Sequence, residues 1–318
     1  MVTRVAILDD YQNVALDVAE WDTLPSDVEL TVFNEQIKGE KAVADALAGF
    51  DIIVAMRERT PCPASLIENL PNLKLLVTTG MRNFAIDIDT ARTRAIPVCG
   101  TALLPYPAAE QAWALILALL KQIPREDRAM HEGGWQAGFA EGLCGKTLGI
   151  LGLGKLGARV AKVALAFDMK VIAWSQNLTE ERAKECGAVK VDKDQLFTEA
   201  DVISVHLVSS PRTRGLVGKR ELGLMKPSAY LVNTARGPIV DEQALLDALR
   251  KHVIAGAALD VFDVEPLPVD HPLRSLDNVV LTGHTGYVMR ENYAVAYGEA
   301  VENILAWLDG KPIRVLNA

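Results

Sequence analysis

The chain has 318 residues, of which 50% are apolar and 23% are charged, and its formal net charge is −8 at pH 7. This length allows two domains with cores of their own, and the composition excludes a disordered or fibrous chain. Because basic and acidic residues are intermixed, we expect neither nucleic acid nor an anionic membrane as a partner.

Short β-branched runs and amphipathic helical stretches alternate along almost the whole chain. In the first third, strands are predicted at 5–8, 51–55, 73–77 and 96–98. A long helix is predicted over 108–122 between flanking prolines, and a looser stretch, 131–145, follows it. The longest apolar run, 112–120, is far too short to cross a bilayer.

Further strand candidates alternate with helices in the rest of the chain, at 147–153, 170–174, 201–207, 230–233, 255–261 and 278–282. The last helix, over about 290–309, is predicted to place Val301, Ile304, Leu305 and Leu308 on one face. This alternation predicts an α/β protein with parallel sheets that helices cover on both faces. Because a glycine-rich turn opens a domain near residue 152, we predict a central domain inserted into an outer one.

The N-terminal stretch MVTRVAILDD is strand-like and ends in acidic residues, whereas a signal peptide would have a basic start and a long apolar core. The cysteines are widely spaced and form no CxxC pair: Cys62, Cys99, Cys144 and Cys186. This spacing favours reduced thiols over disulfides or a zinc site. We therefore expect a cytoplasmic protein that holds no metal.

The segment GILGLGKLGARVAKVALAF, which starts at Gly149, reads as a strand, a glycine turn and a helix. Gly152 would permit the tight turn, Gly154 would let a pyrophosphate approach backbone N–H groups, and Gly157 would let the helix pack close to the strand. The alternative is a glycine-rich turn that binds nothing. The strand, the helix and the strand that follows favour a dinucleotide site, with Lys155 and Leu156 in its first helical turn.

The next strand ends at Trp174 and Ser175 without the carboxylate that commonly bonds the adenosine ribose. No arginine is adjacent to attract a 2′-phosphate, and Arg182 is the nearest cation. We therefore expect NAD as the cofactor, and NADP is not excluded.

Three later segments are more specific: NTARGPIVDEQALLDAL (233–249), GAALDVFDVEPLP (256–268) and NVVLTGHTGY (278–287). Together with GKTLGILGLGKLG and ADVISVHLVSSPRTRGLVG, they resemble the D-isomer-specific 2-hydroxyacid dehydrogenases. The resemblance covers essentially the whole chain and is strongest over 145–284. It implies a Rossmann-type NAD(P)-binding domain, 101–285, inserted into a flavodoxin-like α/β substrate domain formed by 1–100 and 286–318.

The resemblance also implies a catalytic trio of Arg236, Glu265 and His284. A guanidinium can bind the substrate carboxylate bidentately while it polarises the carbonyl, and a histidine can move a proton as hydride moves. A glutamate bonded to the other ring nitrogen would fix the tautomer and stabilise the protonated ring. Each residue alone could be structural, but the three in order favour catalysis.

Further cofactor contacts implied by the resemblance are Ser175, His206, Thr234, Ala235 and Asp260. His206 ends a predicted strand and would line the nicotinamide pocket, although simple packing explains it equally well. The other histidines, His131, His252 and His271, are expected on the surface or in loops.

The family's substrate loop corresponds to Thr79, Gly80, Met81 and Arg82. Gly80 and Met81 are expected to offer backbone N–H groups to the substrate carboxylate. Arg82 stands where the family usually has a second glycine, so it would add a cation that suits a more anionic or larger substrate, unless it points to solvent. Phe84 replaces a usual acidic or amide residue. These differences affect the identity of the substrate more than the type of reaction.

The sequence thus predicts an oxidoreductase that transfers hydride between NAD(P) and a D-2-hydroxy acid/2-keto acid pair. The alternative is a dinucleotide-sensing, corepressor-like binding protein, but a compact chain without disordered tails favours the enzyme. By resemblance, the helix 108–122 and the loop 131–145 would form a twofold interface, so a homodimer is expected. The substrate, the physiological direction and the preference between NAD and NADP stay open.

Overall fold

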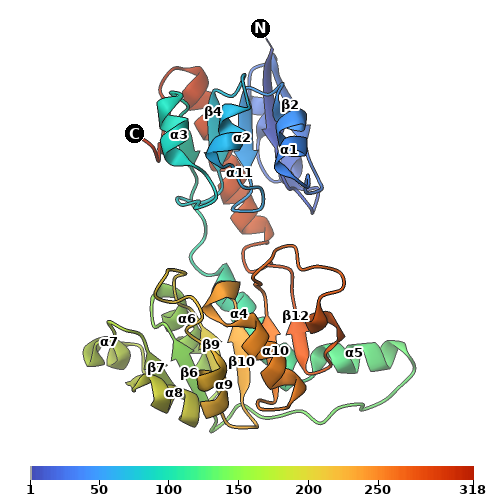
Figure 1. The fold of residues 1–318 in the computed structure, drawn as a ribbon, viewed down its shortest axis with the longest axis vertical. Coiled ribbons are helices and arrows are strands. Elements are labelled where there is room, and N and C mark those ends of the chain that lie inside the picture. The colour runs from blue at the N-terminus through green and yellow to red at the C-terminus, as the bar shows by residue number, and fades with distance from the viewer. Residues whose placement is uncertain (1) are drawn as a thin grey trace. The chain divides into compact units, whose positions relative to one another are not determined.

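The computed structural model describes residues 2–318, which form two compact units. The first unit contains the chain up to Leu104 together with Val288–Ala318, and the second contains Pro105–Tyr287. The last helix, α11 (Arg290–Leu308), therefore belongs to the unit built from the N-terminal elements (Figure 1). The functions expected of the two units remain predictions at this point.

The first unit contains a five-stranded parallel sheet in the order β2-β1-β3-β4-β5. Its strands are β1 (Thr3–Ile7), β2 (Val28–Val32), β3 (Ile52–Ala55), β4 (Leu75–Thr78) and β5 (Val98–Gly100), and its other helices are α1 (Glu40–Leu47), α2 (Ala64–Glu68) and α3 (Ile88–Thr93). This order is that of flavodoxin-like sheets, with the switch point between β1 and β3.

Helices α1, α2 and α3 share one core of the first unit. Leu47 of α1 and Leu66 of α2 belong to the same apolar cluster as Ile53 of β3 and Leu76 of β4. Every residue of β3 and β4 is buried, so these strands have apolar sequences without polar alternation. Helix α11 contacts the sheet at β4.

The second unit contains a seven-stranded parallel sheet in the order β12-β11-β10-β9-β6-β7-β8. Its strands are β6 (Thr147–Leu151), β7 (Lys170–Trp174), β8 (Val189–Lys190), β9 (Val202–Val205), β10 (Tyr230–Asn233), β11 (Gly256–Leu259) and β12 (Val279–Leu281). Its helices are α4 (Pro107–Leu120), α5 (Ile123–His131), α6 (Lys155–Ala166), α7 (Glu180–Glu185), α8 (Lys193–Glu199), α9 (Lys219–Leu224) and α10 (Glu242–Arg250).

Two separate apolar cores lie on the two faces of this sheet. Residues of α4 and α6 pack with Val202 of β9, whereas residues of α8, α9 and α10 pack with its neighbour Ile203. Because successive side chains of a strand point to opposite faces, helices cover the sheet on both sides. The predicted parallel α/β architecture is thereby confirmed.

The strand order of the second unit reverses at β6. The chain continues from β6 to β7 and β8 on one side, and from β9 to β12 on the other. In open parallel sheets, the crevice outside the carboxyl ends of the strands at such a switch point is the usual ligand site. Within residues 2–318, no helix combines the length and the apolar character needed to cross a membrane.

Candidate functional site

In the glycine turn between β6 and α6, neighbouring atoms leave no room for a side chain at two of the glycines. At the third glycine the space is open. Gly152 has a φ of +107°, and a Cβ there would lie 2.8 Å from the carbonyl carbon of His206. A Cβ at Gly157 would overlap the carbonyl oxygen of Gly152. Gly154, the N-cap of α6, has nothing within 4 Å of a Cβ position. The turn and the first helical turn supply the expected residues Gly152, Gly154, Lys155, Leu156 and Gly157.

The open space at Gly154 lies at the N-terminus of a 12-residue helix. Backbone N–H groups and the positive end of the helix dipole favour an anion there. Because no protein atom fills the space, a phosphate group could approach the backbone closely, as the sequence predicts.

The other expected cofactor contacts follow neighbouring strands of the same sheet. Ser175 follows β7, His206 follows β9, and Thr234 and Ala235 follow β10. The Thr234 hydroxyl is buried without a hydrogen-bond partner. Because such a group is costly to bury unpaired, a ligand that bonds it would remove this penalty. The open glycine turn and this hydroxyl both fit a bound dinucleotide.

His206 contacts a residue of β9, the strand that it follows. Its Nε2 lies 2.8 Å from the Ser204 hydroxyl, and burial lowers the pKa of the imidazole to about 4. The ring is therefore neutral near pH 7 and brings no positive charge to the site. No cluster of metal-ligating side chains occurs among the described residues.

Glu265 and His284 are directly bonded in the second unit. His284 Nδ1 lies 2.6 Å from Glu265 Oε2, and the Phe262 N–H donates to Glu265 Oε1 at 2.8 Å. Burial would raise the pKa of the Glu265 carboxyl, but the hydrogen bond and charge of His284, the Phe262 N–H and the charge of Arg236 together lower it below its ordinary value. Glu265 is therefore an ionised partner that faces Nδ1 of the ring.

Arg236 lies immediately after β10 and is fixed through its main chain. The Asn233 side chain donates to the Arg236 carbonyl at 3.0 Å and accepts from the Ala235 N–H at 3.0 Å. The guanidinium also donates to the Ala235 carbonyl at 2.8 Å. The structure thus places all three expected catalytic residues in the second unit, with Arg236 near enough to Glu265 to affect its ionisation.

Asp260 has a structural role, in the turn that carries His284, which was not predicted from the sequence. Its carboxylate is 1% exposed and accepts hydrogen bonds from the Thr282 hydroxyl at 2.6 Å, the Thr285 N–H at 2.8 Å and the Gly286 N–H at 2.9 Å. These donors flank His284, whose φ of 54° is unusual for a residue with a side chain. Asp260 therefore fixes the turn that carries His284, and its contact with a cofactor stays a prediction.

In the first unit, three of the four expected substrate residues take part in internal hydrogen bonds, Arg82 only through its carbonyl, which accepts from the Arg57 guanidinium at 3.5 Å. Thr79 Oγ1 accepts from the Arg57 N–H at 2.9 Å, and the Thr79 carbonyl accepts from the Arg57 guanidinium at 3.1 Å. The Gly80 N–H donates to the buried Thr101 hydroxyl at 3.0 Å. Only Met81 and Arg82 are exposed. The expectation that Gly80 offers its N–H to a substrate therefore does not fit this hydrogen bond.

Arg57 and Asn83 shape this loop, and neither was predicted from the sequence. The Arg57 guanidinium fills the place of the missing Gly80 side chain. The buried Asn83 amide donates to the Arg57 carbonyl at 2.6 Å and to Thr78 Oγ1 at 2.9 Å. For Arg57, the available signal was a cation two residues after the end of β3, because the carboxyl end of β3 adjoins that of β4.

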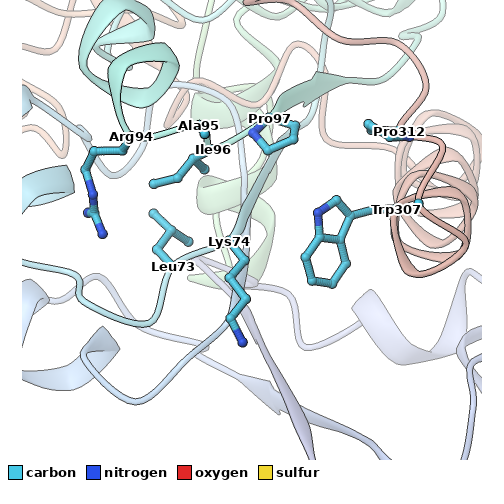
Figure 2. A pocket seen from close by; sticks show the side chains of 9 residues that line it. Leu73, Lys74, Arg94, Ala95, Ile96, Pro97, Trp307 and Pro312 are labelled. Atoms are coloured by element: carbon cyan, nitrogen blue, oxygen red, sulfur yellow. The ribbon is translucent and has the colours of Figure 1, made fainter.

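A pocket of about 360 Å³ in the first unit is lined by residues that directly precede β4 and β5 and by residues at the end of α11 and after it (Figure 2). The substrate loop follows the other, carboxyl end of β4. The two cations of the pocket are already bonded to the protein. Lys74 pairs with Asp51 at 2.7 Å, and the Arg94 guanidinium donates to the Leu70 carbonyl at 3.0 Å. None of the candidate residues lines this pocket, so we assign it no part in the reaction.

Known proteins resemble the chain over most of its length. The family described as "D-isomer specific 2-hydroxyacid dehydrogenase, NAD binding domain" matches residues 113–286. A glyoxylate reductase of Aeropyrum pernix is 39% identical over 287 residues, which cover 87% of this chain and 84% of that protein. The crystal structure of a phosphoglycerate oxidoreductase from Vibrio cholerae O395 has a TM-score of 0.92 and 36% identity, and covers 97% of this chain and 99% of its own.

A D-3-phosphoglycerate dehydrogenase of Archaeoglobus fulgidus is 35% identical over 314 residues. The match covers 98% of this chain but only 58% of that relative. The chain thus spans less than two thirds of the length of this curated relative.

Proposed function

Because this chain belongs to the family of D-isomer specific 2-hydroxyacid dehydrogenases, we propose that it transfers hydride between NAD and a D-2-hydroxy acid/2-keto acid pair. The observation that carries the proposal is the 2.6 Å contact between His284 Nδ1 and Glu265 Oε2. A proton donor, an ionised partner for it and a nearby guanidinium are the groups that reduction of a keto acid requires.

When bound, NADH would supply the hydride that adds to C2 of the keto acid. The turn around Gly154 would hold the pyrophosphate, and the unpaired hydroxyl of Thr234 would bond another part of the cofactor. Neutral His206 would line the site without repelling the positive charge of the oxidised nicotinamide. Ser175, which follows β7, would lie beside the adenosine ribose and has no carboxylate to bond it.

The proton moves through the ring nitrogen that does not face Glu265. Since Nδ1 of His284 contacts Glu265, Nε2 is the atom that would donate a proton to the substrate oxygen as the carbonyl π bond breaks. The imidazole is then neutral. In the oxidation direction, neutral Nε2 takes the hydroxyl proton instead. Glu265 stabilises the protonated ring and fixes its orientation in both directions.

The substrate carboxylate would bind the Arg236 guanidinium, which also polarises the carbonyl. Within the first unit, Met81 and Arg82 are the expected substrate residues that stay accessible, since the Gly80 N–H is already bonded. The Arg57 side chain, 17% exposed, would hold the loop in this shape. Arg82, which is exposed on the same loop, would pair with the second anionic group of a larger substrate.

We also propose a homodimer. Helix α4, part of the expected interface, already buries eight of its residues inside the second unit, so it contributes less than expected. Helix α5 and the loop after it instead expose apolar side chains to solvent: Ile123 52%, Met130 53%, Trp135 75% and Phe139 94%. A second copy of the chain would bury them.

We place the protein in the cytoplasm, where thiols stay reduced. The four cysteines are free in the structure. Burial raises the pKa of the Cys62 thiol to about 12, which makes that thiol unreactive.

Initial rates with a panel of 2-keto acids, each tested with NADH and with NADPH, test the reaction. We expect at least one acid to be reduced with NADH, and we expect His284→Ala to lower kcat by about 100-fold or more, the usual contribution of a general acid. NADH binding, followed by fluorescence titration, should change little in this variant. A panel without a substrate, or a His284→Ala variant as active as the parent, would contradict the proposal.

A further inference from the structure

His271 lies near the end of the segment that carries Glu265. This segment leaves the sheet after β11 and ends at a 3-10 turn, η4 (Pro272–Ser275). His271 lies in a loop, one of the two places that the sequence analysis allowed, and only 13% of its side chain is exposed. The ring has two protein partners, which define how it is oriented.

Each ring nitrogen of His271 has its own partner. Nδ1 accepts from the Leu273 N–H at 3.3 Å, and Nε2 lies 3.1 Å from Glu242 Oε1. Because Nδ1 acts as the acceptor, the proton of the neutral ring belongs on Nε2, which then donates to the carboxylate. The pair therefore forms without a charge on the imidazole.

Glu242 links this histidine to the other side of the site. It is the first residue of α10 and follows the short 3-10 turn η3 (Gly237–Ile239), which begins directly after Arg236. The contact between His271 and Glu242 thus joins the segment of Glu265 to the segment of Arg236, although the two residues are 29 positions apart.

The two segments also touch at a second point. A Cβ at Gly237 would overlap the carbonyl of Phe262, so the two main chains are in direct contact there. The N–H of the same Phe262 donates to Glu265 Oε1 at 2.8 Å. Along the chain, Glu265 therefore lies between the main-chain contact at Phe262 and the contact of His271 with Glu242.

Between these two contacts, the segment bonds mostly to itself. The Arg274 guanidinium donates to the carbonyls of Leu267 and Pro268 at 2.8 Å each. The side chains of Val264 and Val269 are 62% and 92% exposed. The buried side chains of Leu267 and Leu273 pack in the apolar core that α10 shares. The His271–Glu242 contact adds the polar link between this partly exposed segment and the helix after Arg236.

We propose that His271 and Glu242 are positioning residues for the reaction proposed above, which keep Glu265 in contact with His284 without touching the substrate. The inference rests on that proposed function. If their contact is lost, the segment gains freedom and the carboxylate spends less time on Nδ1 of His284. The imidazolium is then less well stabilised.

Several other charged groups lie around these contacts and act on their carboxylates. The charges of Glu242, Asp241 and Arg214 act on Asp263, and the charge of Arg236 acts on Glu265. Burial and the charge of Glu242 raise the pKa of the Asp263 carboxyl above its ordinary value, although Arg214 opposes the shift. The chain has five histidines, so a His284→Ala spectrum identifies the His284 signal in the parent.

The variants are Glu242→Ala, His271→Ala and His271→Gln, with Gln243→Ala as a control on the same helical turn. NMR titration of the labelled imidazoles reads the protonation of His284 without turnover. We expect the His284 midpoint to fall in Glu242→Ala and His271→Ala, and kcat for reduction to fall about tenfold, since small misplacements near a reacting group cost this much or more. His271→Gln, which can still donate to Glu242, should recover part of the loss, and NADH binding should not change.

A Glu265→Gln background separates positioning from general stability. There, adding Glu242→Ala should not shift the His284 midpoint further, because the charge that it positions is already absent. An unchanged midpoint in the single variants, or an equal further shift in the Glu265→Gln background, would overturn the inference. A parent that reduces no keto acid would contradict the proposed function instead, whatever the titration shows.

Discussion

At His284, the two ring nitrogens have different neighbours, so substitutions on the two sides have different effects. Nδ1 faces Glu265, and the turn that carries the ring is fixed by Asp260. Removal of the imidazole, as in His284→Ala, removes the proton donor itself. A change at Glu265 leaves the donor in place and alters how readily it holds a proton.

Glu265→Gln should therefore shift the pH dependence of the reaction. The pKa of the Glu265 carboxyl lies below its ordinary value, so near pH 7 the substitution removes a full negative charge beside the ring. The protonated ring becomes less favourable. Reduction, which needs protonated His284, should lose activity at a lower pH than in the parent, and oxidation, which needs neutral His284, should persist to lower pH.

The measurement is a pair of pH–rate profiles, one for each direction, with parent and variant. Profiles that keep their midpoints while the rates fall would mean that Glu265 does not act through the protonation of His284.

Residues with local roles could be predicted from the sequence, whereas partners distant in the chain could be predicted only where the family resemblance implied them, as for Glu265 and His284. The spacing of Gly152, Gly154 and Gly157 already follows from the geometry of one turn and one helix. His271 pairs with a residue 29 positions away, and Arg57 bonds Thr79 from 22 positions away. Such partners meet only because neighbouring strands end at the same edge of a sheet, so no local pattern marks them.

Among the elements, the turn before α6 offers a sharp test of cofactor binding. Gly154→Val should leave the fold intact, since nothing in the protein lies within 4 Å of a Cβ there, while the added side chain fills the space that a pyrophosphate needs. We expect NADH affinity to fall at least tenfold, a loss of about 1.4 kcal/mol in binding.

Gly223→Val is the matched control, because a Cβ at this glycine of α9 also meets nothing within 4 Å. Fluorescence titration with NADH compares the two variants. Equal affinity of Gly154→Val and the parent would contradict the assignment of the turn.

Asp201, at the start of β9, ties this strand to β6. Its carboxylate accepts from the Thr147 N–H at 2.8 Å and pairs with Lys226 at 2.8 Å. Burial alone would raise the pKa of the carboxyl, but the Lys226 hydrogen bond, the Thr147 N–H and the lysine charges lower it. A carboxyl whose pKa is lower in the folded than in the unfolded protein stabilises the fold at pH values above its unfolded-state pKa. This stabilisation is lost as the pH falls through the folded-state pKa.

Asp201→Asn should therefore lower the free energy of unfolding by about 1–2 kcal/mol at pH 7, and the difference from the parent should shrink below about pH 4. Denaturant unfolding at several pH values measures this. Asp194→Asn, in an exposed pair with Arg220, serves as the control and should change stability little. A deficit of Asp201→Asn that is constant down to pH 3 would rule out the ionised carboxylate as its cause.

Interior strands were predictable, and two edge strands were not. β3 and β4 are buried throughout, so their sequences are continuous apolar runs. β2 lies at one edge of its sheet with no fully buried residue, and β8 consists of two exposed residues. Because edge strands need few apolar side chains, composition alone does not separate them from loops.

For the whole molecule, the exposed apolar side chains after α4 predict association. Trp135 and Phe139 are 75% and 94% exposed, which is costly for a chain that stays single in solution. Light scattering at micromolar concentration should give twice the mass of one chain. Trp135→Asp combined with Phe139→Asp should give a single-chain mass without unfolding, and a parent that is already monomeric would contradict the dimer.

The family was predictable because its motifs lie on strands, turns and helices of the second unit, as the match over 113–286 reflects. The identity of the keto acid was not predictable. In the function we propose, it depends on the first unit's loop, where Arg57 and Asn83 set the shape and Met81 and Arg82 face solvent. These contacts join residues that are far apart in the sequence.

Hydride transfer itself can be followed with deuterium. NADH carrying two deuterium atoms at C4 is incubated with the best keto acid of the panel, and the product is analysed by mass spectrometry and chiral chromatography. We predict one deuterium at C2 of a D-configured 2-hydroxy acid with the parent, and essentially no product in the same time with His284→Ala. Tight binding of NADH without deuterium in any product would contradict hydride transfer and would instead favour a dinucleotide-sensing protein.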